Sequence, residues 1–538
     1  MADPRASFRW AVPESFNFAR DVIDRLALGN RPGLLFISAE GAKRWYSFAE
    51  IAEQSQRYAA ALLDRGVERG GRVIVALPKI PQWIFTMLAL DRLGAVSIPG
   101  PEQLRAKDWT FRANHAEAVA MIGDAANLTE LQGARDAAAT VRTGFVVRGA
   151  VDGWLDLDAL AAGSKPFAGV ETRADEWAYI VYTSGTTKDP KGVIHDHAYT
   201  YAKRMQAQFW LDCTPADLVW CTASTGWAKS LWNVLLGPWS HGSTIVLHEG
   251  AFDPPVRMDL LQSLDVTILC QAPTEYRLEA KLADLGSRWK LPKLRHCVSA
   301  GEPLNPEVIA RWKDAFGLEI LDGYGQTENT LLVANLYGDR VRPGSMGRPT
   351  PGHDVTVIDE DGRECKTDET GDIALRGTPP SLFKGYLKNP EETAKCYRNG
   401  FYLTGDRAYV DDDGYFWFVG RADDVISSGA YRIGPFEVES ALLEHPAVAE
   451  SAVVGSPDPD RGNIVKAFVV LRAGHDGNDA LVRELQEHCK RVTAPYKYPR
   501  EIEFVKELPK TRSGKIRRVE LRQLELERKG ATRASGYL

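Results

Sequence analysis

Residues 183–192, TSGTTKDPKG, combine glycines, hydroxyl groups and lysines directly after an apolar run that ends at Tyr182. Gly185 and Gly192 would let the backbone turn its N–H groups toward a ligand without a side chain in the way. Neutral and cationic donors surround these glycines: Thr183, Ser184, Thr186, Thr187, Lys188 and Lys191. The segment does not match the nucleotide loop G-x-x-x-x-G-K-[ST], because no lysine follows the second glycine of such a spacer. Its composition nevertheless predicts a loop that binds a polyanion and releases it again.

Three further motifs place carboxylates or a lysine where they could do chemistry. DGYGQTEN stands at 322–329, TGD at 404–406, and LPKTRSGK ends at Lys515. Taken alone, T-G-D indicates a turn, and Glu328 is a carboxylate that follows a strand. Lys515 is a long cation on a glycine-containing turn, so it could reach across a cleft.

Short apolar strands alternate with helical patterns through the first part of the chain. A strand at 72–78, a helical pattern at 81–95 and a strand at 96–100 form one such unit. Further apolar strands are predicted at 243–250, 265–273, 293–303 and 318–328. This order predicts an α/β fold with doubly wound parallel sheets that helices cover on both faces. Ligands of such sheets bind beyond the carboxyl ends of the strands, so the loops that follow these strands should lie together.

The pattern changes after about residue 350. Residues 350–420 show short alternating strands with D-G and E-T-G turns, which predict a small antiparallel, β-barrel-like subdomain. Residues 421–538 read as a compact α+β segment with a charged amphipathic helix at 479–491. We therefore predict a large domain at 1–420 and a small domain at 421–538, with the boundary at Arg421–Asp424; one rigid domain is the alternative.

Length and charge limit the class of protein. With 538 residues, 44% of them hydrophobic, the chain can build more than one core, because single cores stop growing near about 250–300 residues. The 66 Lys and Arg and the 72 Asp and Glu give a net charge of −6, which argues against a nucleic-acid binder. The seven cysteines show no C-x-x-C or zinc spacing, as in a reducing compartment. Without a signal core or a membrane-length apolar stretch, we expect a cytoplasmic protein with no membrane span.

Six motifs, taken together, carry a resemblance to a known family. They are TSGTTKDPKG, DGYGQTEN, TGD, GRADDVISS (420–428), YRIGPFEVE (431–439) and LPKTRSGKIRR (508–518). Their order resembles that of the AMP-forming acyl-CoA synthetases of the adenylate-forming superfamily. VPESFNFARDVID (12–24), TGW (225–227) and TAPYKYPR (493–500) are most similar to the medium-chain branch. The resemblance covers nearly the whole chain.

The resemblance implies a reaction in two halves. A carboxylate attacks the α-phosphate of ATP to give acyl-AMP and pyrophosphate; the thiol of coenzyme A then attacks the acyl carbonyl, and AMP leaves. The residues that would bind ATP are Thr183, Ser184, Gly185, Thr186, Thr187, Lys188, Lys191, Gly301, Glu302, Pro303, Asp322, Gly323, Tyr324, Gly325, Gln326, Asp406 and Arg421.

Different groups of these residues would contact different parts of the nucleotide. The 183–192 loop would hold the β- and γ-phosphates. Residues 322–324 would line the adenine and ribose site, with the Tyr324 ring against the purine and 301–303 as the opposite wall. Asp406 would accept hydrogen bonds from the ribose hydroxyls, and Arg421 would support the ribose or a phosphate.

Three residues would carry the chemistry. Lys515 would contact the carboxylate and the α-phosphate and offset charge in the adenylation transition state. Thr327 would donate to the α-phosphate. Glu328 would hold Mg²⁺, because a hard carboxylate oxygen suits a cation that bridges phosphate oxygens.

The second half-reaction needs a coenzyme A site and a moving domain. The residues that would bind coenzyme A are Gln103, Gly429, Ala430, Tyr431, Arg432, Arg461 and Lys490, where cations suit its phosphates. Asp423 would be the hinge about which the small domain rotates between the two halves. Ala430 replaces a glycine that the family usually has beside Tyr431, so its methyl group would narrow the path of coenzyme A unless Gly429 compensates. Asn329 stands where the family often has threonine.

The acyl pocket would be formed by Trp227, Lys229, Trp232 and Gly325. Gly325 stands where acetate-activating relatives have a tryptophan, so we expect a cavity and an acid larger than propionate: medium-chain, branched or aromatic. A buried lysine is costly unless it is paired, so Lys229 is expected to point to solvent or to narrow the entrance.

The partners implied are a small carboxylic acid, ATP and coenzyme A, with a homo-oligomer as a further possibility. Two other functions stay open at this point. The first is an adenylating enzyme that passes its acyl group to a carrier protein. The second is a catalytically silent protein that binds an acyl group or a nucleotide. Production of acyl-CoA, AMP and pyrophosphate would distinguish an acyl-CoA synthetase from both of these alternatives.

Overall fold

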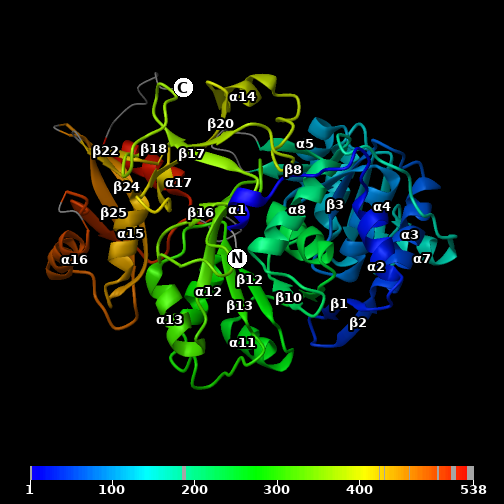
Figure 1. The fold of residues 1–538 in the computed structure, drawn as a ribbon, viewed down its shortest axis with the longest axis horizontal. Helices are drawn as coiled ribbons and strands as arrows, with labels where there is room; N and C mark the ends of the chain where they lie inside the picture. Colours follow the sequence, from blue (N-terminus) through cyan, green and yellow to red (C-terminus); the bar gives the residue numbers. More distant parts are fainter. Residues whose placement is uncertain are drawn as a thin grey trace.

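A computed structural model describes residues 3–183, 190–422, 424–428, 431–459, 461–493, 496–510 and 516–529, and the side chains of Asn127, Tyr431 and Arg432 are not described. Two large sheets form the centre of the part of the chain from β1 (Pro32–Ile37) to β16 (Arg348–Pro349) (Figure 1). The seven-stranded sheet has the order β7 (Leu155–Asp156), β6 (Thr143–Val147), β5 (Ala120–Asp124), β3 (Arg72–Ala76), β4 (Val96–Pro99), β8 (Trp177–Thr183) and β9 (Lys191–Asp196). Its neighbouring strands are parallel except for the antiparallel pair β8 and β9.

The second sheet has nine strands. Their order is β16 (Arg348–Pro349), β15 (Leu331–Ala334), β14 (Ile320–Gly325), β13 (His296–Ala300), β12 (Ile268–Gln271), β10 (Leu218–Cys221), β11 (Thr244–His248), β1 (Pro32–Ile37) and β2 (Lys43–Ser47). The run from β14 to β1 is parallel, and the strands at the two edges are antiparallel.

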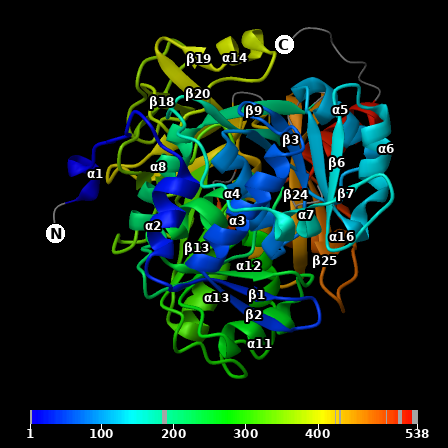
Figure 2. The ribbon, with the colours of Figure 1, turned by 90° about the vertical axis from the view of Figure 1, so that its right-hand side faces the viewer.

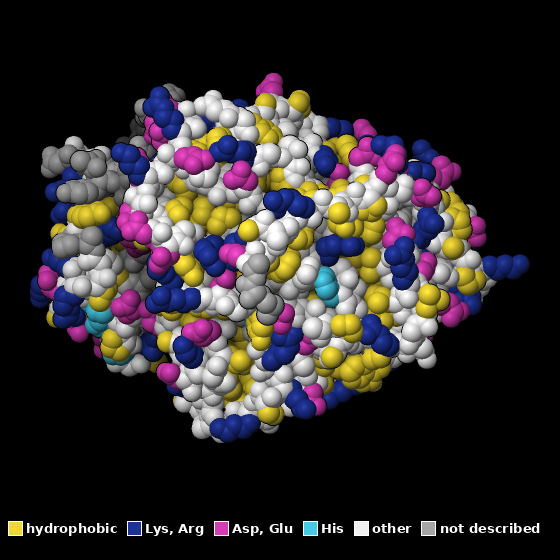
Figure 3. Space-filling view, viewed as in Figure 1, with side chains coloured by type: hydrophobic (Ala, Val, Ile, Leu, Met, Phe, Trp, Pro, Cys, Tyr) yellow, Lys and Arg dark blue, Asp and Glu magenta, His cyan; other side chains and the backbone are white. Residues whose placement is uncertain are grey.

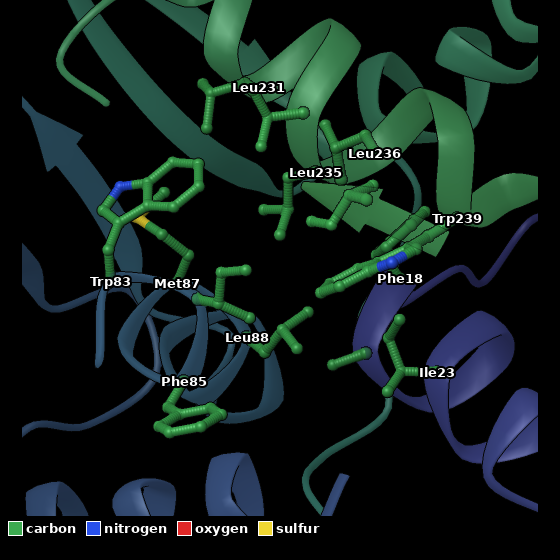
Figure 4. Packing of buried hydrophobic residues seen from close by; sticks show 14 of the residues in the cluster. Phe18, Ile23, Trp83, Phe85, Met87, Leu88, Leu231, Leu235, Leu236 and Trp239 are labelled. Carbon is green, nitrogen blue, oxygen red and sulfur yellow. The ribbon is translucent and has the colours of Figure 1, made fainter. Parts of the chain in front are cut away.

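The main core lies between the two sheets. The helices that fill this layer are α3 (Phe48–Leu63), α4 (Pro81–Leu93), α8 (His197–Phe209), the π-helical turn η3 (Leu231–Leu236) and α10 (Gly237–Ser240). In the close-up, Leu88 of α4 lies opposite Leu235 and Leu236 of η3 (Figure 4). Buried apolar contacts of this kind supply most of the stabilisation of a core, at roughly 25 cal/mol per Å².

Strand residues alternate between this core and two outer cores. In β1, Leu34 belongs to the central core, whereas Leu35 faces the outer one, as the period of two in a strand requires. The outer helices are α5 (Ala106–Ala116) and α6 (Thr129–Ala137) on the seven-stranded sheet, and α11 (Pro254–Ser263), α12 (Pro273–Ala280) and α13 (Pro306–Phe316) on the nine-stranded sheet. Figure 2 shows α5 and α6 on the outer side of β6.

Helix ends follow local sequence signals. Ser47 and Glu50 form a reciprocal capping box at the start of α3. α4 begins with Pro81 and ends at Gly94, whose φ of +63° is open to glycine at little cost. The short helical elements that remain are α1 (Pro4–Ser7), η1 (Ala19–Ile23), α2 (Asp24–Ala27), η2 (Ala125–Asn127), α7 (Leu157–Gly163) and α9 (Ala228–Ser230).

An antiparallel sheet follows the nine-stranded sheet. Its strands are β17 (Asp354–Ile358), β18 (Gly371–Arg376), β19 (Tyr397–Arg398), β20 (Phe401–Val410) and β21 (Phe416–Arg421), with α14 (Pro390–Lys395) beside them. The last segment, which we call the C-terminal lobe, begins after β21 and lies at the left in Figure 1. It contains β22 (Ile426–Ser428), β23 (Tyr431–Ile433), α15 (Pro435–Leu443), β24 (Val448–Asp458), β25 (Gly462–Leu471), α16 (Asp479–Val492), β26 (Glu501–Phe504) and α17 (Arg518–Arg528).

The predicted α/β fold with doubly wound parallel sheets is confirmed, together with the small α+β segment at the end of the chain. β21 ends at Arg421 and β22 begins at Ile426, so the predicted boundary falls between two strands. The domain limits and the hinge at Asp423 stay predictions, and Asp423 itself lies outside the described residues.

Candidate active site

The expected site residues gather where strands of the two large sheets end. Thr183 ends β8, Ala300 ends β13 and Gly325 ends β14. The loop after β4 meets the loop after β10, because a Cβ on Gly226 would lie 2.0 Å from the backbone nitrogen of Pro101. The two sheets therefore meet at their carboxyl ends, which is where open α/β sheets bind ligands.

The segment between β8 and β9 joins two antiparallel neighbours. Thr183 pairs with Lys191 in the register of these strands. Gly192 lies inside β9, and a Cβ there would be 3.1 Å from Ile180 and 3.3 Å from Leu387. The expectation that Gly192 turns the backbone is therefore wrong: close packing explains that glycine. The expected phosphate-binding residues Ser184, Gly185, Thr186, Thr187 and Lys188 lie outside the described residues.

Lys191 is held by a carboxylate that the sequence motif does not contain. Its Nζ lies 2.5 Å from Oε2 of Glu392 in α14. The same ammonium lies 5.0 Å from the centroid of the Tyr386 ring. The hydroxyl of Tyr386 in turn donates to Oε1 of Glu328 at 2.8 Å. Two expected site residues, Lys191 and Glu328, are thus linked through one tyrosine.

Three expected nucleotide residues form a hydrogen-bonded cluster at the end of β14. Oδ2 of Asp406 accepts from the hydroxyl of Tyr324 at 2.5 Å and from Nε2 of Gln326 at 2.8 Å. Gln326 also donates to the backbone carbonyl of Thr404. Arg421 pairs with Asp406 across β20 and β21. The motifs DGYGQTEN and TGD, which are far apart in the sequence, therefore meet in space.

Asp322, two residues before Tyr324 in β14, is buried. Its Oδ1 accepts from the backbone nitrogen of Gly323 at 2.9 Å. Burial raises the pKa of Asp322 to about 7, and hydrogen bonds from the backbone oppose that rise only in part. Gly323 itself packs against Trp210 and Leu331, where a Cβ would be too close.

Thr327 is fixed through its backbone. Nε2 of the buried His195 lies 2.7 Å from the carbonyl oxygen of Thr327. That nitrogen must carry a proton, because a carbonyl oxygen can only accept. The His195 ring stacks on Tyr199 with centroids 3.6 Å apart.

A buried lysine continues this stack. The ammonium of Lys203, a residue that is 0% exposed, lies 3.2 Å from the centroid of Tyr199 and 5.2 Å from that of Trp232. Its nitrogen has no hydrogen-bond partner among the described residues. Burial lowers its pKa well below the usual value. Sequence reasoning missed Lys203 and His195. Lys203 stands four residues after Tyr199 in the same helix, which was an available signal, whereas His195 lies in β9 and had no such signal.

The acyl-pocket residues differ from expectation at two positions. Lys229 does not point to solvent: its ammonium donates to the carbonyls of Gln271 at 3.1 Å and Ala300 at 2.9 Å. Gly325 does not leave a void at its Cβ position, which would lie 1.9 Å from the carbonyl oxygen of Thr330. The backbone of the following turn occupies the room that the cavity argument assigned to a missing side chain.

The two tryptophans of the predicted acyl pocket differ in burial. Trp227 is half-buried before α9, and Trp232 in η3 is 8% exposed. The indole nitrogen of Trp232 donates to the hydroxyl of Tyr199. Trp232 is therefore tied to the Tyr199 stack that supports Thr327.

The segment 301–303 forms a loop after β13. Gly301 is exposed, with φ +108° and no atom within 4 Å of a Cβ position, and Pro303 is partly exposed. Glu302 accepts from Arg277 at 2.7 Å and from the hydroxyl of Thr274 at 3.0 Å, both on α12. The carboxylate of Glu302 is therefore held by α12.

Most of the remaining expected site residues belong to the C-terminal lobe. Lys515, Gly429 and Ala430 lie outside the described residues, and only the backbones of Tyr431 and Arg432, in β23, are described.

The described coenzyme A candidates are exposed or partly exposed. Lys490 pairs with Glu487 at 2.7 Å. Arg461 and Gln103 are exposed. Gln103 lies on the loop after β4, outside the C-terminal lobe that carries the other two.

Carboxylates of the lobe hold the last helix. Arg518, which follows the expected catalytic loop, donates to both oxygens of Glu439 at 3.0 and 2.6 Å. Arg522, one turn further along α17, pairs with Asp424, just after the expected hinge. Across the lobe boundary, Asn305, which precedes α13, donates to the hydroxyl of Ser440 at 3.2 Å.

The described residues contain no group of three or more His, Cys, Asp or Glu side chains that could hold a metal ion. The expected Mg²⁺ residue fits a different kind of site. Glu328 uses Oε1 for Tyr386, and Oε2 has no hydrogen bond within the described part of the chain. One carboxylate with an available oxygen suits Mg²⁺, which usually keeps waters and binds through substrate phosphates.

The surface and the helices add two observations. Basic and acidic side chains are interspersed over the face in Figure 3, in line with the balanced composition. Among the described residues, every helix is too short or too polar to cross a bilayer.

Comparison with known proteins gives matches over nearly the whole chain. The AMP-binding enzyme family matches residues 23–387, and the AMP-binding enzyme C-terminal domain matches residues 437–515. The acyl-coenzyme A synthetase ACSM3, mitochondrial, of Mus musculus is 43% identical, over 97% of this chain and 92% of the relative.

Solved structures agree with this match. The anthranilate CoA ligase AuaEII, in complex with anthranoyl-AMP, is 30% identical, with a TM-score of 0.89 over 96% of this chain and 99% of that chain. A benzoate CoA ligase from Burkholderia xenovorans LB400 is also 30% identical, with a TM-score of 0.84 over 94% of this chain and 100% of that chain.

Proposed function

The chain belongs to the AMP-binding enzyme family and is an AMP-forming acyl-CoA synthetase, and from this premise we propose its substrate class and the roles of its residues. As an acid–thiol ligase it consumes ATP and coenzyme A. Its substrate is proposed to be a carboxylic acid larger than propionate: medium-chain, branched or aromatic. The relatives named above act on acyl groups, anthranilate and benzoate, and this supports the proposal.

The observation that carries the assignment of the nucleotide site is the Tyr324–Gln326–Asp406 cluster. In the proposal, Asp406 receives the ribose hydroxyls, because a carboxylate fixed by two donors keeps further lone pairs for a ligand. Tyr324 offers its ring to the purine, with Gly301 on the opposite side. Arg421 lies across the strand pair from Asp406 and would assist at the ribose or a phosphate.

The phosphates would lie at the end of β8. Lys191 is proposed to bind the β- or γ-phosphate together with the 184–188 loop. Thr327 would donate to the α-phosphate, and the His195 hydrogen bond to its carbonyl supports a fixed position. Lys515 would stabilise the charge that develops as the acid attacks, an effect for which one donor is worth about 10²–10³ in rate.

Glu328 would hold Mg²⁺ through Oε2. The metal would supply charge neutralisation between phosphate oxygens when it is bound. Tyr386 keeps the Glu328 carboxylate oriented by its hydrogen bond to Oε1. The hydroxyl donates to this oxygen, so the other oxygen can face a cation.

Thioester formation is proposed to use the cations Arg432, Arg461 and Lys490 for the phosphates of coenzyme A. Rotation of the C-terminal lobe about Asp423 would replace Lys515 by this face. The cytoplasmic location stays a proposal, and the mammalian relative is named mitochondrial. A homo-oligomer stays a prediction.

Trp232 would limit the acyl pocket, and Trp227 would flank it. Transfer of the acyl group to a carrier protein and a silent binding role are not favoured, because the relatives are CoA-forming enzymes. A panel of acids from acetate to dodecanoate, with branched and aryl acids, tests the substrate class. AMP release that depends on coenzyme A should peak above propionate; a maximum at acetate would refute it.

A further inference from the structure

Glu392 and Lys191 form an ion pair inside the proposed phosphate region. Their charged atoms are 2.5 Å apart, and the side chains are 18% exposed for Lys191 and 25% for Glu392. The two residues are 201 positions apart in the sequence. Lys191 therefore meets a carboxylate at the place where the proposed function needs it to meet a phosphate.

A second lysine shares the same carboxylate. Nζ of Lys395 lies 2.7 Å from Oε1 of Glu392, so each carboxylate oxygen has its own ammonium. Lys395 is 69% exposed. The hydrogen bonds from Lys191 and Lys395 lower the pKa of Glu392 to about 2, so it stays ionised at any usual assay pH.

The backbone around Glu392 is fixed by α14. Oδ1 of Asn389 accepts from the backbone nitrogen of Glu392 at 3.1 Å and caps the helix. Tyr386 lies between the ion pair and Glu328: its ring faces Lys191 at 5.0 Å, and its hydroxyl donates to Glu328. Glu392 is thus positioned by the helix cap and by Lys395 as well as by Lys191.

We propose that Glu392 is an internal competitor of the polyphosphate for Lys191: it neutralises Lys191 in the nucleotide-free enzyme, yields it to ATP, and takes it back as pyrophosphate leaves. The inference rests on the proposed role of Lys191 at the β- or γ-phosphate. Lys395 continues to compensate the charge of Glu392 while Lys191 is engaged by phosphate. The exchange needs only a movement of one flexible side chain.

The competition predicts an effect on affinity with a defined sign. Removing the charge of Glu392 leaves Lys191 without a counter-ion, so phosphates bind it more tightly. Partly exposed ion pairs are modest in strength, so the gain should be roughly two- to fivefold. It should shrink at high ionic strength, because salt screens the pair.

The test compares Glu392→Gln with Glu391→Gln, the same charge change on the exposed neighbouring residue. Acid-dependent pyrophosphate exchange gives KM for ATP, and product inhibition gives Ki for pyrophosphate. Both constants should fall roughly two- to fivefold in Glu392→Gln and stay near the wild-type values in Glu391→Gln. A rise in both constants would overturn the proposal, since Glu392 would then be orienting Lys191 toward phosphate. Unchanged constants would also overturn it.

Lys191→Met provides the second arm. In that background Glu392→Gln should no longer change either constant, because no ammonium is left to compete for. An equal gain with and without Lys191 would refute competition and indicate a general charge effect. If the wild-type enzyme shows no pyrophosphate exchange with any acid, the proposed function fails; if exchange is normal and the variants behave alike, only this inference fails.

Discussion

Two regions of the proposed nucleotide site are prepared in opposite ways. At the end of β14, Tyr324 and Gln326 both donate to Asp406, so the acceptor for neutral hydroxyls is already fixed by donors. At the start of β9, Lys191 is neutralised by Glu392. The first region is held ready for its ligand, and the second is occupied by an internal counter-charge.

The difference follows from the charge of each ligand part. A carboxylate that accepts two hydrogen bonds keeps lone pairs for more, so a fixed cluster does not prevent binding. A lysine without an anion would leave a concentrated positive charge in a partly buried place, which is costly unless compensated. A lysine that binds a polyanion which later leaves therefore needs another anion that can compensate its charge in between.

Loss of Lys515 tests the cationic region with the largest expected effect. Lys515→Ala should lower acid-dependent pyrophosphate exchange by about 10²–10³-fold, because a developing charge loses its donor. Lys510→Ala is the matched control, since Lys510 pairs with Glu450 at 2.6 Å. Near-normal exchange in Lys515→Ala would remove this lysine from adenylation.

Asp406→Asn tests the fixed region. The substitution takes away one acceptor and the negative charge, so KM for ATP should rise by about 10–100-fold, as for hydrogen bonds to charged groups. Asp372→Asn, which breaks an ion pair with Arg398 elsewhere in the same sheet, should change KM little. Equal effects from the two variants would show that Asp406 has no special place at the ribose.

Lys229→Met tests whether Lys229 is a structural cation, in contrast to the exchangeable Lys191. Two carbonyls at the ends of β12 and β13 lose their donor, which should cost about 1–3 kcal/mol of stability and lower Tm by a few degrees. Lys313→Met on the exposed face of α13 is the control. A variant with normal Tm and an altered acid preference would instead place Lys229 in the acyl pocket.

The pH dependence of stability sharpens the account of the fixed region. Burial raises the pKa of Asp322 to about 7 from 3.8, so its stabilising contribution is complete below pH 3.8 and is lost as pH rises through 7. Asp322→Asn cannot ionise. Between pH 6 and 7.5 the variant should gain about 1 kcal/mol relative to wild type, measured by thermal unfolding. Exposed Asp152→Asn is the control, and a constant difference between Asp322→Asn and wild type would contradict the assignment.

The strands and their layers could be predicted from the sequence because apolar runs of this length have few alternatives. The strand expected at 72–78 is observed at 72–76, and the helix expected at 479–491 at 479–492. The family resemblance implied that DGYGQTEN and TGD act together, and Tyr324 and Asp406 are in contact.

The rest depends on contacts that no motif contains. Glu392 lies outside the lysine loop, and its pairing with Lys191 arises only when α14 packs beside β9. Lys229 is satisfied by backbone carbonyls, which every residue has, so the sequence held no sign of its partners. Gly325 was interpreted as a missing side chain, whereas the carbonyl of Thr330 requires a glycine there.

The last described helix has a consequence for the opposite end of its lobe. Arg518 forms an ion pair with Glu439, and Arg522 forms one with Asp424. Both carboxylates lie in the first part of that lobe. A chain cut short by proteolysis or a premature stop before α17 would strip both acids of their counter-ions. The last helix therefore stabilises the segment where its own lobe begins. Loss of this helix would destabilise residues about a hundred positions earlier in the chain.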